Sequence, residues 1–418
     1  MVRPYNPAGL TTPIAGIDVG TTKICTVIGE LGHGGHLRIL GVGVTPSQGL
    51  KKGMVVNIDQ TVECIASSID KCQKISGFHI EQANVSIANP NITSKNSKGV
   101  IGLANNGHDI GHDDIERALD AARTMAGPTG RDVLHVIPRG FVVDNQEGVK
   151  NPIGMSGSRL EVETHVVVST GGTIQNLVKC VERAGVKPLE LVLEPLASAE
   201  AVLTDAEREA GVMLVDIGAG TTDIALFLDG QPWHTAVMPV GGSHITNDVA
   251  IGLRAPFEVA EELKVKHGRA SSEGVLADEP VRIATEGGPQ QYMRAELCDI
   301  IEARVEEILH MVLGELHDSG YKSVLPAGVV LTGGTASLSG IAQVAARVLE
   351  MPVRIGIPGE LEGLIDTISS PAYATSVGLV RWSFREGTGA DPQREDRHNQ
   401  ASGEIYGRLR GWLKAFLP

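Results

Sequence analysis

The chain has 418 residues, of which 42% are hydrophobic and only 3% aromatic, and this length and composition predict two to four globular domains with aliphatic cores. Its formal net charge of −14 argues against broad nucleic-acid binding, which needs a basic surface. The five cysteines include no Cys-x-x-Cys, and there is neither an apolar signal segment at the N-terminus nor an apolar run long enough to span a bilayer. We therefore expect a reduced, cytosolic protein.

The first predicted element is an apolar strand that ends in a polar hairpin, Gly16-Ile-Asp-Val-Gly-Thr-Thr-Lys23. An acidic residue stands at the end of the strand, a glycine makes the turn, and paired threonines lead into a second apolar run. A helix is expected over 59–76, because apolar side chains recur there at helical spacing.

From 83 to 169 the sequence changes to short runs of alternating apolar and polar residues, which predict strands. They surround one predicted helix, over 113–122, that opens with an aspartate suited to capping it. We expect this region to be a small α/β insertion. A helix over 173–184, a strand over 189–193 and a helix over 197–203 are predicted to follow.

The second half of the chain repeats the opening pattern as Val212-Met-Leu-Val-Asp-Ile-Gly-Ala-Gly-Thr-Thr-Asp223. Asp18 and Asp216 lie 198 positions apart, too far for a short solenoid repeat, so the pattern predicts a duplicated domain with two facing hairpins. The further predicted elements are a helical region over 245–266, a polar, glycine-rich stretch over 268–288, a helix over 291–316, a strand over 328–331 and a helix over 340–349.

Both hairpins have the composition of phosphate-binding turns. Glycine lets the backbone approach a phosphate closely, successive N–H groups form an anion-binding concavity, and threonine hydroxyls add donors. Asp18 and Asp216 are candidates to hold Mg²⁺ through water. A single copy fits an ordinary β-hairpin with a polar tip equally well, but two copies favour a phosphate clamp. The candidate phosphate-binding residues are Gly20, Thr21, Thr22, Lys23, Gly218, Gly220, Thr221, Thr222 and Asp223.

Three weaker patterns allow a structural and a functional interpretation. Gly333, Gly334 and Thr335 follow a strand and precede a helix, which fits a sharp turn or, beside two phosphate hairpins, an adenosine site. Glu194 precedes a proline and starts a helix, so it either caps that helix or orients Mg²⁺ or an attacking water. Glu261 and Lys264 form either a solvated ion pair or a bracket around ribose and adenine.

The last residues predict an amphipathic helix over 403–418, beyond a polar linker over 385–402. An apolar stripe runs along one side, with basic residues on the other, and this fits a helix lying in the plane of a membrane. Docking on the chain's own core or in a partner's groove is the alternative. The candidate membrane-binding residues are Ile405, Arg408, Leu409, Trp412, Leu413, Lys414, Phe416 and Leu417.

These motifs together resemble a known superfamily. The segments 16–23, 194–198, 212–223, 331–336 and 370–378 are similar, in their usual order, to the five ATP-site elements of the actin/sugar-kinase/chaperone superfamily, over essentially the whole chain before the linker. The chain lacks the usual subdomain between Lys52 and Ala83 and carries a small insertion after it. With the stretches 49–53 and 260–268 and the amphipathic tail, this resembles the FtsA family, actin-like proteins that tie the FtsZ ring to the cytoplasmic membrane.

The resemblance implies an α/β, actin-like two-lobed ATPase fold with four subdomains and a C-terminal amphipathic helix. In the implied division, residues 1–83 and 166–200 form the first large subdomain, and 84–165 form the small subdomain inserted in it. Residues 201–242 and 320–384 form the second large subdomain, and 243–319 form the second small one.

The resemblance also implies ATP and Mg²⁺ in the central cleft, with Asp18 and Asp216 holding the hydrated metal and Glu194 assisting. No residue is an obvious strong general base, so at most slow hydrolysis coupled to assembly is expected. The implied partners are the chain itself, membrane lipids, other division proteins and the FtsZ C-terminal peptide, bound on 243–319 where Arg294 and Arg304 look like contact residues. The implied place is the cytoplasmic face of the membrane at the division site.

Other proteins share the phosphate hairpins. A sugar kinase would need a carbohydrate pocket and would have no use for the tail, and a chaperone of this class would need a substrate domain that is missing here. The actin-like partner of type IV pilus inner-membrane proteins shares both fold and insertion, and the 403–418 helix is the feature that separates it from the FtsA family.

Overall fold

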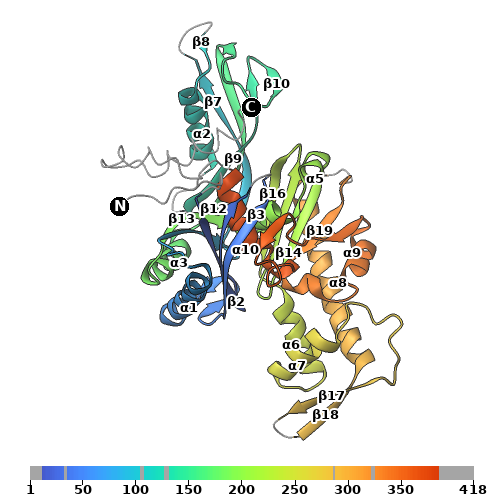
Figure 1. Ribbon diagram of the computed structural model, residues 1–418. Coiled ribbons are helices and arrows are strands. Elements are labelled where there is room, and N and C mark those ends of the chain that lie inside the picture. The colour runs from blue at the N-terminus through green and yellow to red at the C-terminus, as the bar shows by residue number, and fades with distance from the viewer. Residues whose placement is uncertain are drawn as a thin grey trace.

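The computed structural model describes residues 12–32, 35–103, 108–126, 131–285, 288–321 and 325–385. Two sheets form the centres of two lobes, and a small subdomain extends from each lobe, so the molecule is elongated (Figure 1). The predicted helix 403–418 and residues 386–402 of the predicted linker lie outside the described ranges.

The first sheet has the strand order β13-β6-β1-β2-β3-β21. β1 (Ile14–Val19), β2 (Lys23–Leu31) and β3 (Leu37–Pro46) are successively antiparallel, whereas β6 (Gln82–Ile87) runs parallel to β1 and β13 (Lys187–Leu193) parallel to β6. Helix α1 (Ile58–Ser76) packs on one face and α10 (Ala374–Arg385) on the other. Burial on both faces explains the continuous apolar run of β1.

The second sheet repeats this topology in the order β16-β15-β14-β19-β20. β14 (Val212–Ile217), β15 (Thr222–Leu228) and β16 (Gln231–Met238) are successively antiparallel, and β19 (Val329–Thr332) and β20 (Val353–Ile355) continue in parallel from β14. Helices α8 (Arg294–Asp318) and α9 (Ile341–Leu349) share its core. The matching order of the two sheets confirms the predicted duplication.

One segment belongs to a different lobe from the one predicted. The division into subdomains that the family resemblance implies assigns all of 320–384 to the second large subdomain. In the structure β21 (Leu361–Gly363) pairs with β3, and α10 packs on β1 and on α4 (Glu194–Val202), so the end of this segment lies on the first lobe. Gly16 of β1 lies in close contact with Leu379 of α10, so α10 packs on the first sheet. Sequence spacing cannot reveal this contact.

The insertion forms the subdomain at the top of Figure 1. Its antiparallel sheet has the order β10-β9-β12-β7, with β7 (Thr93–Gly102), β9 (Arg131–Val143), β10 (Gln146–Val149) and β12 (Arg159–Thr170), and α2 (His112–Ala126) packs against it. β8 (His108–Asp109) and β11 (Ser156–Gly157) form a separate pair. α2 begins at His112, so Asp113, the aspartate predicted to open and cap the helix, lies inside its first turn. The neighbouring Asp114 accepts a hydrogen bond from the N–H of Gly111.

The second small subdomain differs from the prediction in two places. The expected helical region over 245–266 is two helices, α6 (Gly242–Gly252) and α7 (Phe257–His267), because Arg254 adopts φ +51° and Pro256 interrupts the hydrogen-bond ladder. Part of the glycine-rich stretch forms a hairpin, β17 (Pro280–Thr285) with β18 (Gly288–Met293), that leads into α8.

Helix α3 (Gly171–Arg183) packs against α1 and β13. The remaining elements are short: β4 (Leu50–Lys51), β5 (Met54–Val55), α5 (Asp205–Ala210) and the 3₁₀ turns η1 (Gly334–Ser337) and η2 (Pro371–Tyr373). None of the helices within the described ranges is both long and apolar enough for a bilayer span.

Candidate functional site

A pocket of about 510 Å³ opens between the two lobes, within the size range of small-ligand sites. Both predicted hairpins line it, together with residues from α4, α6, α7 and the 333–338 turn. The predicted residues that line it are Asp18, Gly20, Thr21, Thr22, Lys23, Glu194, Asp216, Gly218, Gly220, Thr221, Glu261, Lys264, Gly333, Gly334 and Thr335.

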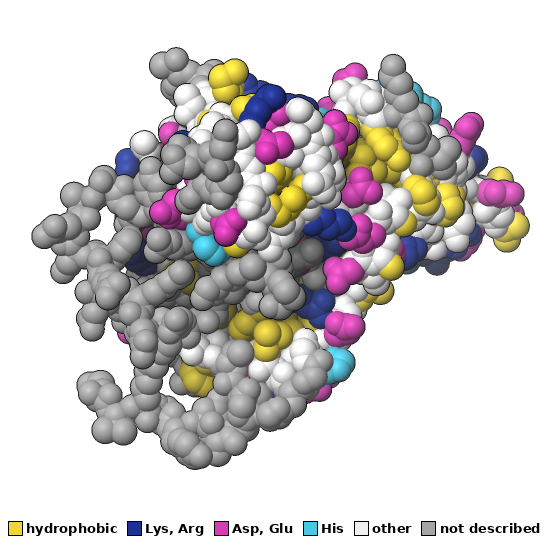
Figure 2. All heavy atoms as spheres, turned by 90° about the horizontal axis from the view of Figure 1, so that it is seen from above, with side chains coloured by type: hydrophobic (Ala, Val, Ile, Leu, Met, Phe, Trp, Pro, Cys, Tyr) yellow, Lys and Arg dark blue, Asp and Glu magenta, His cyan; other side chains and the backbone are white. Residues whose placement is uncertain are grey.

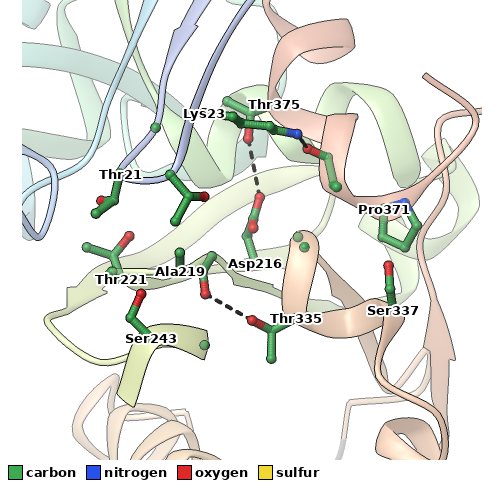
Figure 3. A pocket seen from close by; sticks show the side chains of 18 of the residues that line it. Thr21, Lys23, Asp216, Ala219, Thr221, Ser243, Thr335, Ser337, Pro371 and Thr375 are labelled. Atoms are coloured by element: carbon green, nitrogen blue, oxygen red, sulfur yellow. Dashed lines mark hydrogen bonds between the residues drawn. The ribbon is translucent and has the colours of Figure 1, made fainter. Parts of the chain in front are cut away.

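The two hairpins make the same turn. The N–H of Gly20 donates to the carbonyl of Lys23 at 3.1 Å, and the N–H of Gly218 donates to the carbonyl of Thr221 at 3.0 Å. Their tips touch: a Cβ on Gly220 would lie 2.6 Å from Thr21 Oγ1, and Figure 3 shows Thr21 close to Thr221. The pocket is therefore closed at this end by backbone that has no room for side chains.

The two aspartates occupy equivalent positions at the ends of β1 and β14. Asp18 accepts hydrogen bonds from Ser86 and Ser376, both at 3.0 Å, and Asp216 accepts from Ser198 at 2.6 Å and Thr375 at 3.3 Å (Figure 3). Burial raises the pKa of Asp18 and raises that of Asp216 to about 6, although the hydroxyl donors oppose the shift. Each carboxylate is thus held in one orientation, and the positive charge of Lys23 offsets only part of the effect of burial on its pKa.

Glu194 adds a third carboxylate to the pocket wall. Burial, and then the neighbouring charges of Asp223, Asp18 and Asp216, raise its pKa well above the usual range. A carboxyl group in this setting is easily kept protonated. Across the described residues, no three His, Cys, Asp or Glu side chains converge to hold a metal ion directly.

Two predicted phosphate-site residues do not line the pocket. Thr222 is fully buried, and its hydroxyl donates to the carbonyl of Val240 at 2.9 Å, which joins β15 to the chain before α6. Asp223 lies behind the wall, where it accepts a hydrogen bond from Thr221 at 2.9 Å. Its side chain is 1% exposed, and burial raises its pKa well above the usual range. Both residues support the turn from behind.

Lys23 extends from the first hairpin toward η2. Its ammonium donates to the carbonyl of Ala372 (Figure 3) and lies 3.7 Å from the centre of the Tyr373 ring. A cation over an aromatic face is held electrostatically, so Lys23 has a defined resting place beside the carboxylates.

The other end of the pocket is apolar and comes from α7 and the turn after β19. Glu261 pairs with Lys264 at 2.7 Å, and Lys264 also donates to Thr246 at 2.8 Å and to the carbonyl of Gly242 at 3.2 Å. Phe257, Val265 and Leu338 add exposed or half-exposed carbon surface beside them. Such a wall, apolar with a few polar groups, suits a flat ring.

The segment 370–378, which resembles an ATP-site element, contributes Pro371, Ala372 and Thr375 to the lining. Sequence reasoning missed other lining residues: Gly53, Gly242, Ser243, Phe257, Val265, Ser337 and Leu338. A signal existed for two of them, because Phe257 and Val265 stand four residues on either side of Glu261 and so share its helix face. Gly53 stands 32 residues beyond Thr21, and no local pattern reveals that it approaches the first hairpin.

The candidate partner residues lie on α8, away from the pocket lining. Arg294 pairs with Glu279 at 2.8 Å and donates to the carbonyl of His267 at 3.1 Å. Arg304 pairs with Asp248 and, at 2.6 Å, with Glu307. Both guanidinium groups therefore have partners within the subdomain. The candidate membrane residues in 403–418 lie outside the described part of the chain.

Solved structures define the class of protein. The chain is similar to one described as "PilM-PilN type IV pilus biogenesis complex", with a TM-score of 0.62 and 16% identity over 88% of this chain and 97% of that one. It is also similar to MreB5 of Spiroplasma citri bound to ADP, with a TM-score of 0.53 and 13% identity over 88% of this chain and 95% of that one. At these identities the likeness concerns the fold alone, and the protein has the actin-like ATPase fold.

Sequence relatives narrow this class to one family. The cell division protein FtsA of Pseudomonas aeruginosa is 41% identical over 96% of this chain and 97% of its own length, and that of Escherichia coli is 36% identical over 96% and 97%. Family profiles described as "Cell division protein FtsA" and "SHS2 domain inserted in FTSA" match residues 213–378 and 90–168. The chain belongs to the FtsA family of cell division proteins.

Proposed function

We propose that this protein binds ATP with Mg²⁺ between its lobes, polymerises, and attaches the FtsZ ring to the cytoplasmic face of the membrane at the division site. The single observation that supports this best is the pocket between two identical turns, because both turns present backbone and hydroxyl donors to one space. Family membership supports the division role and argues against a sugar kinase or a pilus assembly protein.

In this proposal the nucleotide spans the pocket. Gly20–Lys23 and Gly218–Thr221 bind phosphates, while Gly333–Thr335, Glu261 and Lys264 hold the nucleoside, with Thr222 and Asp223 supporting the second turn. The ADP bound to MreB5 of Spiroplasma citri supports a nucleotide here by analogy of fold.

The carboxylates fit a hydrated Mg²⁺. Asp18 and Asp216 are buried, oriented by hydroxyl donors, and raised in pKa, so a nearby cation would favour their ionised forms. They would hold the metal through water, because Mg²⁺ usually keeps several of its water ligands in proteins. The metal would neutralise phosphate charge, and Glu194 would help to position a water for slow hydrolysis.

The partners are proposed on separate surfaces. The FtsZ C-terminal peptide would bind the subdomain over 243–319, where an acidic segment would compete with Glu279 and Asp248 for Arg294 and Arg304. The helix over 403–418 would bind membrane lipids through its apolar stripe.

Nucleotide titration of the purified full chain tests the site. We expect MgATP to bind and to raise the melting temperature, and AMP to bind far more weakly because it lacks the phosphates that the turns contact. Equal affinity for AMP and MgATP, or no binding of either, would contradict the proposed site.

A peptide pull-down tests the division role. The immobilised FtsZ C-terminal peptide should retain this chain, whereas the corresponding partner peptide of a type IV pilus protein should not. The reverse pattern would support the pilus alternative.

A further inference from the structure

A short hairpin lies against the tips of both phosphate turns. The strap, residues 50–55, consists of β4, a two-residue turn and β5. Gly53, in its turn, lines the pocket, and its N–H donates to Thr21 Oγ1 at 3.3 Å. The strap therefore contacts the ligand space through backbone, next to the first phosphate turn.

The strap also touches the second lobe. A Cβ on Gly220 would lie 3.2 Å from the Cα of Lys52, so the strap backbone packs directly on the second turn. From behind, Gly53 is so close to the carbonyl of Ala88 that a Cβ would overlap it. The strap is thus fixed between β6 and the second lobe, at the point where the lobes meet.

Lys52 has an unusual backbone conformation in this strap. Its φ is +50°, a region that residues with a Cβ occupy rarely. Such conformations persist where the surroundings fix them, and they cluster at functional sites. Here the neighbouring glycines, Gly49 and Gly53, also have positive φ, so the whole turn is shaped to present position 52 at the junction of the lobes.

Lys52 brings a positive charge to this junction. Within the described ranges it has no ion-pair partner. After burial, the charge of Lys52 is the largest cause of the lowered pKa of His244, which lies in α6 directly after the lining residues Gly242 and Ser243. A cation from the first lobe thus lies near the start of a helix from the second, a setting that favours an anion between them.

We propose that Lys52 contacts the terminal phosphate of a bound nucleoside triphosphate and so makes the strap discriminate ATP from ADP. This inference rests on the proposed function. The nucleoside end of the pocket belongs to the second lobe, through α7 and the 333–338 turn. A phosphate chain that starts there and passes between the turns ends nearest to first-lobe elements, of which the strap is one. Lys52 would then act as a specificity-determining residue for the γ-phosphate.

The test compares affinities of the full chain for MgATP and MgADP in three variants. Lys52→Met should lower the affinity for MgATP about tenfold and leave that for MgADP within about twofold, because only the triphosphate reaches the ammonium. Lys52→Arg, which keeps the charge, should retain most of the discrimination. Lys51→Met is the matched control in the same strap, with an exposed side chain, and should change neither affinity.

Retained MgADP binding shows that a variant is folded. Two results for Lys52→Met would overturn the inference. One is an equal loss of affinity for MgATP and MgADP, because the residue would then only hold the strap in place, and the other is no change in either affinity. If the unmodified chain binds neither nucleotide, the proposed function itself fails and the inference falls with it.

Discussion

At the scale of single residues, the pocket brings together carboxyl groups whose ionisation is opposed by burial. Asp18, Glu194 and Asp216 line the pocket with Asp223 behind them, and burial raises the pKa of every one of the four. Hydroxyl donors from Ser86, Ser198, Thr375 and Ser376 offset part of this cost by orienting the two aspartates. An unliganded site of this kind is destabilised until a cation or a proton enters it.

Asp216→Asn should therefore stabilise the protein without ligand. Since the pKa of Asp216 in the folded state is about 6, above its ordinary value of 3.8, ionising it costs stability as pH rises from about 4 to 6, and the full cost is present at pH 7.5. Asparagine keeps an acceptor for Ser198 and carries no charge. We expect a gain on the order of 1–3 kcal/mol in unfolding free energy at pH 7.5, and loss of Mg²⁺-dependent nucleotide binding.

Urea denaturation with and without MgATP measures both effects. Asp278→Asn, at an exposed position, is the matched control and should change neither quantity. A loss of stability in ligand-free Asp216→Asn would show that the carboxylate is structurally required.

At the scale of elements, the first lobe depends on close approach between helices. Gly378 lies in α10 where it crosses α4, and a Cβ there would overlap the carbonyl of Ala197. In this crossing Thr375 donates a hydrogen bond to Asp216 and Ser376 donates one to Asp18, the two aspartates of the pocket. The packing of α10 on α4 therefore also determines the position of the hydroxyl groups that orient the pocket aspartates.

Gly378→Ala should cost about 1–3 kcal/mol of unfolding free energy, because the helices must separate to admit the methyl group. Gly314→Ala is the control: it is also a glycine within a helix, but it is exposed and a Cβ there meets nothing, so the change should stabilise by up to about 1 kcal/mol. Chemical denaturation compares them, and effects of the same sign would refute this account of the crossing.

A second element-scale feature joins the inserted subdomain to the second lobe. His165 in β12 donates from Nδ1 to Asn96 Oδ1 and accepts from Thr235 of β16 at Nε2, both at 2.9 Å, which fits a neutral ring. The side chain is fully buried. Burial, and then His234, Arg139 and His135, lower its pKa to about 3.

His165→Gln should reduce the loss of unfolding free energy that occurs as the pH is lowered. The folded-state pKa of about 3 lies below the ordinary 6.5, so the unfolded chain binds a proton first and stability falls as pH drops below 6.5. Between pH 7.5 and 5.0 this should contribute about 2 kcal/mol of loss, which glutamine removes. Denaturation at both pH values tests it against His36→Gln at an exposed histidine; equal pH dependence in both variants would exclude this role.

At the scale of the whole molecule, the sequence predicts those features that depend on residues close together in the chain. The aspartate, glycine and threonine pattern predicts both hairpins, and their repetition predicts the two matching sheets. The place of α10 on the first lobe depends on contacts across hundreds of residues, and the approach of Gly53 to Thr21 depends on a contact between residues 32 positions apart. The β17–β18 hairpin escaped prediction because the apolar signal of β17 is confined to Val281 and Ile283, while β18 is polar and largely exposed and adds none.

The central claim is that one chain joins a nucleotide-binding actin-like body to a membrane and to FtsZ. Its most direct test is flotation of FtsZ with anionic vesicles in MgATP, using the full chain, a chain ending at 402, and Trp412→Glu. Nucleotide binding by each form serves as the folding control. We predict that only the full chain brings FtsZ to the vesicle fraction. If the truncated chain carries FtsZ there equally well, the account is contradicted.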